Sequence, residues 1–163
     1  MTDDFTAGLP RKRMAAAVLF SDGRGRVLLV EPAYKPDWEI PGGSVEADES
    51  PYAAAVREVR EELGLTVRPG RLLVTDWVPP RPGRTEGLML VFDGGVLTAD
   101  QVARISLPAD ELRGWAWCTE DEAGARLSGL LARRVAAAVR ARAASTFLYL
   151  ENGFWEAAPE PAG

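Results

Sequence analysis

Histidine is missing from this 163-residue chain, and cysteine occurs only once, as Cys118. Without histidine, the chain by itself lacks Ser-His and Cys-His nucleophile pairs and imidazole ligands for a metal. A single cysteine excludes an intramolecular disulfide and fits a reducing compartment. Acid–base or metal chemistry is therefore left to Asp, Glu, Lys, Tyr or the backbone, and carboxylate oxygens suit hard cations such as Mg²⁺ or Mn²⁺.

Long apolar runs and a surplus of basic residues are also absent. No run approaches the ~20 apolar residues of a membrane span, and the N-terminal residues lack the apolar stretch of a signal peptide. Together with the single cysteine, this predicts a cytoplasmic protein with no membrane partner. The net charge of −5 and the pI near 4.9 exclude a broadly basic surface for duplex nucleic acid. To bind a small polyanion, the protein would need a local positive feature such as a metal ion, an arginine or a helix N-terminus.

Length and composition are those of one globular domain. At 163 residues the chain can bury roughly two-thirds of its unfolded surface, and 47% of its residues are hydrophobic and 26% charged. We predict a flexible N-terminal segment at 1–13, a single domain over 14–150 and a loose tail at 151–163, because both ends are polar or rich in Ala and Pro.

Apolar runs of strand length alternate with turn-forming segments and two helical patterns. One helix is predicted at 51–63, with Ser50 as its N-cap and Gly64 at its end. A second helical region follows Thr119 and runs to about residue 144. Strands are predicted at 14–20, 26–31, 38–43, 71–78, 88–95 and 114–119, and 146–153 is either a last strand or an ordered tail. The fold class is therefore α/β, with a mixed β-sheet sandwiched between helices.

The helix at 51–63 carries two different faces. An apolar stripe, predicted to dock on the sheet, consists of Tyr52, Val56, Val59 and Leu63. The other side carries three carboxylates within an arc of roughly 100°: Glu58, Glu61 and Glu62. Like charges at this spacing repel one another, although a solvated face explains the pattern in many helices. The preceding Gly42 and Gly43 allow close backbone approach and offer carbonyl ligands, which favours a metal site.

The spacing of these residues resembles the Nudix box, Gly-x5-Glu-x7-Arg-Glu-U-x-Glu-Glu-x-Gly-U, where U is a bulky aliphatic residue. In this chain Gly43 is followed after five residues by Glu49, and after seven more by the run Arg57-Glu58-Val59-Arg60-Glu61-Glu62-Leu63-Gly64-Leu65. All nine specified positions match. The segments "WEIPGG" and "ELRGWAW" extend the resemblance over about 14–144, while Asp48 stands where many members carry Gly.

The resemblance implies a metal site and a set of catalytic residues. Mg²⁺ or Mn²⁺ would be held by Glu58, Glu62 and the carbonyl of Gly43, with Glu61 as a further ligand or as the group that takes a proton from water. Arg57 and Glu49 would orient the carboxylates, although a surface ion pair also explains them.

Family members often draw another carboxylate from outside the box. Here it would be Glu111, as a general base or further ligand, with Asp110 as the neighbouring option and a polar loop residue as the alternative explanation.

Substrate contacts are less clearly marked. Trp38 is a candidate for stacking on a base, although a packing role also explains it. Arg81 and Arg84 lie in the loop 79–87, where they could reach a phosphate or ribose or remain solvated.

By resemblance, the expected function is Mg²⁺-dependent hydrolysis of a phosphoanhydride in a nucleoside diphosphate-linked compound, the reaction of a nucleotide pyrophosphatase. Pro79 and Pro80, about fifteen residues beyond the box, give a slight preference for ADP-ribose or nucleotide-sugar substrates. The alternatives are house-cleaning of nucleoside triphosphates, including oxidised ones, and a non-catalytic sensor that binds nucleotide derivatives. The resemblance also leaves a homodimer open.

Overall fold

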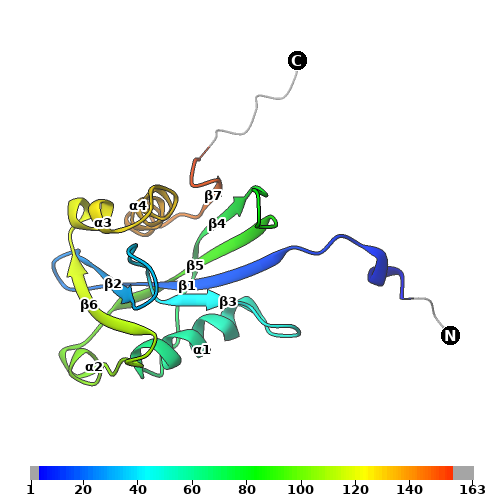
Figure 1. The fold of residues 1–163 in the computed structure, drawn as a ribbon. Helices are drawn as coiled ribbons and strands as arrows, with labels where there is room; N and C mark the ends of the chain where they lie inside the picture. The colour runs from blue at the N-terminus through cyan, green and yellow to red at the C-terminus, as the bar shows by residue number, and fades with distance from the viewer. Residues whose placement is uncertain (1–3, 156–163) are drawn as a thin grey trace, which may run out of the picture.

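The computed structural model describes residues 4–155, and its centre is a seven-stranded mixed sheet. The strand order is β6-β2-β1-β5-β4-β7, with β3 paired to β1 (Figure 1). The β1–β5 and β4–β7 pairs are parallel, and the other pairs are antiparallel. The strands are β1 (Arg13–Ser21), β2 (Val27–Pro32), β3 (Gly42–Ser44), β4 (Leu72–Val78), β5 (Gly87–Val96), β6 (Leu112–Cys118) and β7 (Leu148–Glu151).

Helices cover both faces of this sheet. Helix α1 (Pro51–Leu63) lies on one face, and α3 (Glu120–Arg126) and α4 (Gly129–Ala143) lie on the other (Figure 1). Successive residues of β1 point to opposite faces, so Leu19 packs in the core under α4 while Val18 and Phe20 pack in the core under α1. The predicted α/β sandwich is confirmed.

The helical region predicted to run from Thr119 to about residue 144 is two helices rather than one. Leu127 ends α3 in an extended conformation (φ −82°, ψ 153°), and its backbone pairs with Trp38. Ser128 then caps α4 by accepting a hydrogen bond from the Leu131 N–H at 3.3 Å. The continuous apolar periodicity of this region concealed the break, since Leu127 fits the periodicity and is also buried in the structure.

Two other elements differ from the sequence prediction. Strand β3 begins at Gly42, later than predicted, and Trp38 and Glu39 make only isolated bridges. A short helix, α2 (Ala99–Ala103), was not predicted, although Thr98 and Gln101 form a complete capping box at its start.

The chain ends contain local structure within the described range. Phe5–Gly8 forms a 3₁₀ helix, η1, and β1 begins at Arg13. At the other end, β7 pairs in parallel with β4, and a turn joins Glu151 to Phe154 through two backbone hydrogen bonds. Residues 1–3 and 156–163, which belong to the segments predicted to be flexible, lie outside the described residues. Within 4–155, no helix is long and apolar enough to cross a membrane.

Candidate metal and phosphate site

Helix α1 is fixed at both ends by the predicted residues. The Ser50 hydroxyl accepts a hydrogen bond from the Ala53 N–H at 3.1 Å, and Gly64 ends the helix at φ 69°, a left-handed conformation that favours glycine. The docking face is rotated from the predicted stripe, because Tyr52 is 40% exposed and Val56 only partly buried. The residues that are buried are Ala54, Ala55, Val59, Glu62 and Leu63. The carboxylates therefore lie at the margin of the docking face rather than opposite it.

Strand β3 brings two glycines against this margin. Gly42 pairs with Ala17 on β1, and a Cβ on Gly42 would lie 2.5 Å from the Ala16 carbonyl oxygen. A Cβ on Gly43 would lie 2.7 Å from Glu58 Oε2 and 2.5 Å from its Cδ. Real Cβ atoms do not approach this closely, so glycine is required at position 42, where the neighbours are backbone atoms, whereas a Cβ at position 43 would displace the Glu58 carboxylate. The Glu58 carboxylate thus rests directly on the β3 backbone.

Arg57 holds the carboxylates around it in place. Its Nε and Nη2 donate to the two oxygens of Glu49 at 2.8 and 2.9 Å, and its Nη2 also donates to the Ser44 carbonyl at 3.0 Å. Its Nη1 donates to Glu58 Oε1 at 2.9 Å and lies 3.3 Å from Glu61 Oε2. The hydrogen bonds from Arg57 lower the pKa of Glu49 to about 2, and those to Glu49 raise the pKa of Arg57.

Glu62 is the buried acid of this group. Only 9% of the residue is exposed, and its Oε2 has no hydrogen-bond partner in the described part of the chain. Burial, followed by the charge of Glu58, raises the pKa of Glu62 to about 8. Burial also raises the pKa of Glu58, although Arg57 opposes it.

Two acids outside α1 lie close enough for their charges to raise the pKa of Glu62: Glu39 and Glu111. Glu111 was predicted from the sequence, and its carbonyl accepts a hydrogen bond from the Ala33 N–H at 2.8 Å. Glu39 was not predicted from the sequence. Its position between Trp38 and the buried Ile40 in a short extended segment was the signal that could have indicated it. Its carboxylate is paired with Lys35. Acids from the chain before β3 and before β6 therefore lie near Glu62 as well.

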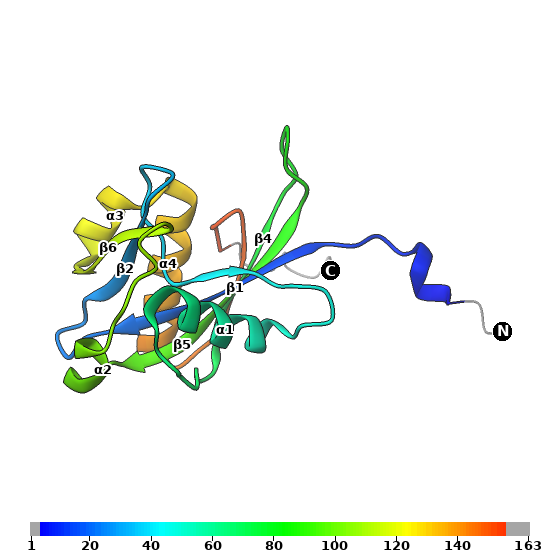
Figure 2. The same cartoon turned by 60° about the horizontal axis from the view of Figure 1, so that its bottom comes forward.

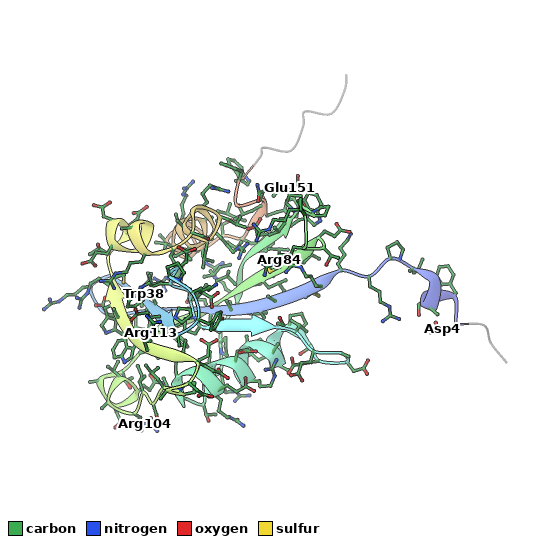
Figure 3. The ribbon with its side chains drawn as sticks, viewed as in Figure 1. Asp4, Trp38, Arg84, Arg104, Arg113 and Glu151 are labelled. Atoms are coloured by element: carbon green, nitrogen blue, oxygen red, sulfur yellow. The ribbon has the colours of Figure 1, made fainter. Side chains whose placement is uncertain are left out.

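The candidate substrate contacts come from elements other than α1. Trp38 packs against the core under α4, with the Arg126 guanidinium 4.6 Å from its ring centroid. The backbones of Arg81 and Arg84 pair with each other in an isolated bridge at the turn between β4 and β5. Figure 3 shows Trp38 and Arg84 in well-separated parts of the molecule.

The two arginines of the hairpin belong instead to a basic cluster. Arg13 lies near them, since burial and then the charges of Arg84 and Arg81 lower its pKa. Arg13 and Lys12 line one side of a hollow of about 310 Å³. Its other side is formed by the chain leading into α1, including Ser44 and Glu49, both of which bind Arg57.

The donor set suits a hard divalent cation. Among residues 4–155, no three Asp, Glu or Cys side chains are grouped as a metal site would require, and Arg57 binds the carboxylates of Glu58 and Glu61. The buried Glu62 oxygen without a partner and the Gly43 backbone beneath Glu58 nevertheless provide oxygen ligands of the kind Mg²⁺ and Mn²⁺ take. The residues therefore fit such an ion.

Comparison with known proteins agrees with this arrangement. The family model described as the NUDIX domain matches residues 11–140. The chain belongs to the Nudix family. Nudix hydrolases in general need a divalent metal ion such as Mg²⁺, in keeping with the oxygen ligands around Gly43.

Curated Nudix relatives match only part of the chain. Diphosphoinositol polyphosphate phosphohydrolase 3-alpha of Mus musculus is 47% identical over 64 residues, which is 39% of this chain and 39% of that protein. Diphosphoinositol polyphosphate phosphohydrolase 2 of Homo sapiens is 47% identical over 64 residues, 39% of this chain and 36% of that protein. The chain thus matches well under half of the length of these relatives.

Solved structures share the Nudix fold over most of the chain. A MutT protein from Methanosarcina mazei Go1 has a TM-score of 0.66 at 23% identity, covering 85% of this chain and 99% of that one. A UDP-X diphosphatase has a TM-score of 0.70 at 17% identity, covering 90% of this chain and 70% of that one. At these identities the likeness establishes the fold alone.

Proposed function

We propose that this Nudix protein hydrolyses a phosphoanhydride bond in a nucleoside diphosphate linked to a second moiety, of the ADP-ribose or nucleotide-sugar type. The observation that carries the proposal is the buried Glu62 carboxylate, with an oxygen that has no protein partner, beside Glu58 on the Gly43 backbone. Burying a carboxylate costs free energy unless a cation or a proton neutralises its charge. The phosphohydrolase names of the curated relatives support the reaction class, and Pro79 and Pro80 after β4 support the substrate type.

In this proposal, Mg²⁺ or Mn²⁺ is held by Glu58, Glu62 and the Gly43 carbonyl, with Glu61 as a further ligand or as a proton acceptor. The bound cation supplies charge neutralisation for the diphosphate and a lower pKa for the attacking water. Glu61 is half exposed and only 3.3 Å from the Arg57 guanidinium, so it can exchange this ion pair for another partner at small cost.

The remaining residues position reactants and accept a proton. Arg57 orients Glu58 while its bidentate pair with Glu49 fixes its own guanidinium. The water oxygen bonds to one phosphorus, its proton passes to Glu61 or Glu111, and the bridging P–O bond breaks. The products are a nucleoside monophosphate and a phosphorylated remainder.

A second candidate is a substrate with additional phosphate groups. Lys12 and Arg13 line the hollow beside the Arg57 network, and the charges of Arg81 and Arg84 reach Arg13. Arg13, Arg81 and Arg84 concentrate positive charge on this side of the hollow, and Lys12, which is paired with Glu86, lies beside them. Such a group suits the polyphosphorylated compounds for which the curated relatives are named, or the triphosphate of a nucleotide.

A hydrolysis screen tests these candidates together. Wild-type protein with Mg²⁺ or Mn²⁺ is incubated with ADP-ribose, nucleotide sugars, dinucleoside polyphosphates, normal and oxidised nucleoside triphosphates and a diphosphoinositol polyphosphate. Glu62→Gln is run in parallel, with Asp121→Asn as the matched control because Asp121 is exposed at the start of α3. We expect turnover of one substrate class, a loss of orders of magnitude in Glu62→Gln and none in Asp121→Asn.

Two results would contradict the proposal. If Glu62→Gln turns over substrate at the wild-type rate, the proposed metal site takes no part in the reaction. If the wild-type protein hydrolyses none of the substrates but still binds one of them, a non-catalytic sensor would instead be favoured.

A further inference from the structure

The connection between β2 and β3 is held by hydrogen bonds at both of its ends. At its start, the Ala33 N–H donates to the Glu111 carbonyl at 2.8 Å, and Arg113 Nη2 donates to the Ala33 carbonyl at 2.8 Å. At its end, the Trp38 N–H donates to the Arg126 carbonyl at 3.0 Å. Figure 2 shows this connection as a blue loop beyond the end of β2, next to α3. A loop tied at both ends presents its side chains in a defined position, as a binding site requires.

Strand register directs Glu39, at the end of this connection, toward the carboxylates of α1. Val30 on β2 pairs with Trp115 on β6 and exchanges two backbone hydrogen bonds with Glu39, at 2.8 and 3.0 Å. Residues directly opposite each other in antiparallel pairs point to the same face of a sheet. Val30 lies in the core under α1 and Trp115 packs against that core, so the Glu39 side chain also points to the α1 face. Its charge accordingly raises the pKa of Glu62, after burial and the charge of Glu58.

Lys35 and Tyr34 lie next to Glu39. The Lys35 ammonium forms an ion pair with the Glu39 carboxylate, and the Lys35 side chain is 37% exposed. Because an ammonium has three donors, it can keep this ion pair and still bind an anion from solvent. Lys35 Nζ lies 6.0 Å from the centroid of the Tyr34 ring, and Tyr34 is 74% exposed. Burial raises the pKa of the Tyr34 phenol, and the charges of Glu39 and Glu62 raise it further, so the ring lies beside the carboxylate site.

We propose that Tyr34 and Lys35 bind the nucleotide half of the substrate, with the nucleobase stacked on the Tyr34 ring and its phosphate beside Lys35. This inference rests on the proposed function and names residues that would select the substrate. Trp38, the aromatic candidate from the sequence, packs against the core under α4, so the exposed aromatic ring of this connection is Tyr34.

The two side chains match the two parts of a nucleotide. An aromatic ring accepts the flat face of any base, and such stacking typically improves affinity about 5- to 150-fold. The phosphate of a nucleotide lies one ribose away from its base, a spacing that the 6.0 Å between the Lys35 ammonium and the Tyr34 ring centroid can accommodate. Lys35 also neutralises Glu39, so this side of the carboxylate site repels a phosphate less.

Calorimetric titration of the full chain with AMP and with ribose 5-phosphate, in the presence of Mg²⁺, tests the proposal because the two ligands differ by the base. Tyr34→Ala should raise the dissociation constant for AMP at least about tenfold and leave that for ribose 5-phosphate unchanged. Tyr34→Phe keeps the ring and should bind AMP as the wild type does. Lys35→Ala should weaken the binding of both ligands alike, since both carry the phosphate.

Tyr149→Ala is the matched control. Tyr149 is a tyrosine that is 48% exposed on β7, at the opposite edge of the sheet from β6, so its loss should leave AMP binding unchanged. With ADP-ribose as substrate, Tyr34→Ala should raise KM by the same factor as the dissociation constant for AMP and leave kcat nearly unchanged, because the base is remote from the bond that breaks.

Several outcomes would overturn the inference. If Tyr34→Ala binds AMP as tightly as the wild type, the ring does not stack on the base, and the proposed hydrolysis is unaffected. Equal losses for AMP and ribose 5-phosphate in Tyr34→Ala would mean that the side chain only supports the loop, and unchanged binding in Lys35→Ala would exclude the phosphate contact. A wild-type protein that binds AMP no better than ribose 5-phosphate has no base site. If that protein still hydrolyses ADP-ribose, this inference alone fails, and if it hydrolyses no nucleotide derivative, the proposed function fails with it.

Discussion

The stability of the metal-free protein should depend strongly on Glu62. The pKa of this buried carboxyl is about 8, compared with an ordinary value of 4.5. Because the folded pKa is raised, the folded state binds the proton more tightly than the unfolded state. Stability is therefore highest below pH 4.5 and falls as the pH rises toward 8. Relative to low pH, the free energy of unfolding is lower by about 3 kcal/mol at pH 7, which lies 2.5 units above the ordinary pKa. At pH 5 it is lower by less than about 1 kcal/mol.

Glu62→Gln should remove this cost because glutamine has nearly the same shape and no charge. At pH 7 without metal, we expect the variant to be more stable than wild type by up to about 3 kcal/mol, or about 5–10 °C in melting temperature. At pH 5 the two proteins should melt within a few degrees. Millimolar Mg²⁺ should then stabilise the wild type and leave Glu62→Gln unchanged, because the ion binds only the folded carboxylate site.

Thermal and urea unfolding in EDTA, from pH 5 to pH 8, measure these differences. Glu61→Gln is the matched control, since the Glu61 side chain is 54% exposed on the same helix and should shift stability by no more than about 0.5 kcal/mol. The reasoning would be refuted by a wild-type stability that does not fall between pH 5 and pH 8. A Glu62→Gln variant that is less stable than wild type at pH 8 would refute it equally.

Three further substitutions probe other parts of the molecule. Gly43→Ala places a Cβ against the Glu58 carboxylate, so we expect the Mg²⁺-induced rise in melting temperature to disappear; an unchanged rise would contradict the contact. Asp76→Asn should lower the free energy of unfolding, measured in urea, by about 3–5 kcal/mol. The reason is that Arg134, which is paired with this fully buried carboxylate at 2.7 Å, loses its counter-charge. Arg57→Lys cannot reproduce the bidentate pair with Glu49, so kcat should fall about 10–100-fold while the circular dichroism spectrum is retained.

Short-range patterns in the sequence were sufficient to predict helix α1 and its ends. The capping hydroxyl of Ser50 and the left-handed Gly64 act within one helical turn, so their positions alone predict where α1 begins and ends. The spacing of the glutamates places them together on α1 for the same reason. The identity of the family, the mixed sheet and most strand positions also followed from local spacing and apolar runs.

Other predictions failed where two distant segments had to meet. The break between α3 and α4 depends on the pairing of Leu127 with Trp38, which lies far away in the sequence. The same pairing holds Trp38 on the α4 side of the sheet, where its ring packs against the core and Arg126 lies over it. No local pattern reports such a pairing.

What the sequence by itself determined is therefore the helix, its three glutamates and the glycine turn before it, because these are set by backbone conformation over a few residues. The burial of Glu62, the approach of Glu39, and the grouping of Arg13 with Arg81 and Arg84 were decided only by the tertiary structure. Solvent exclusion and the electrostatic interactions between charges depend on distances in space. Strand order and helix docking set those distances for residues that the chain separates by dozens of positions.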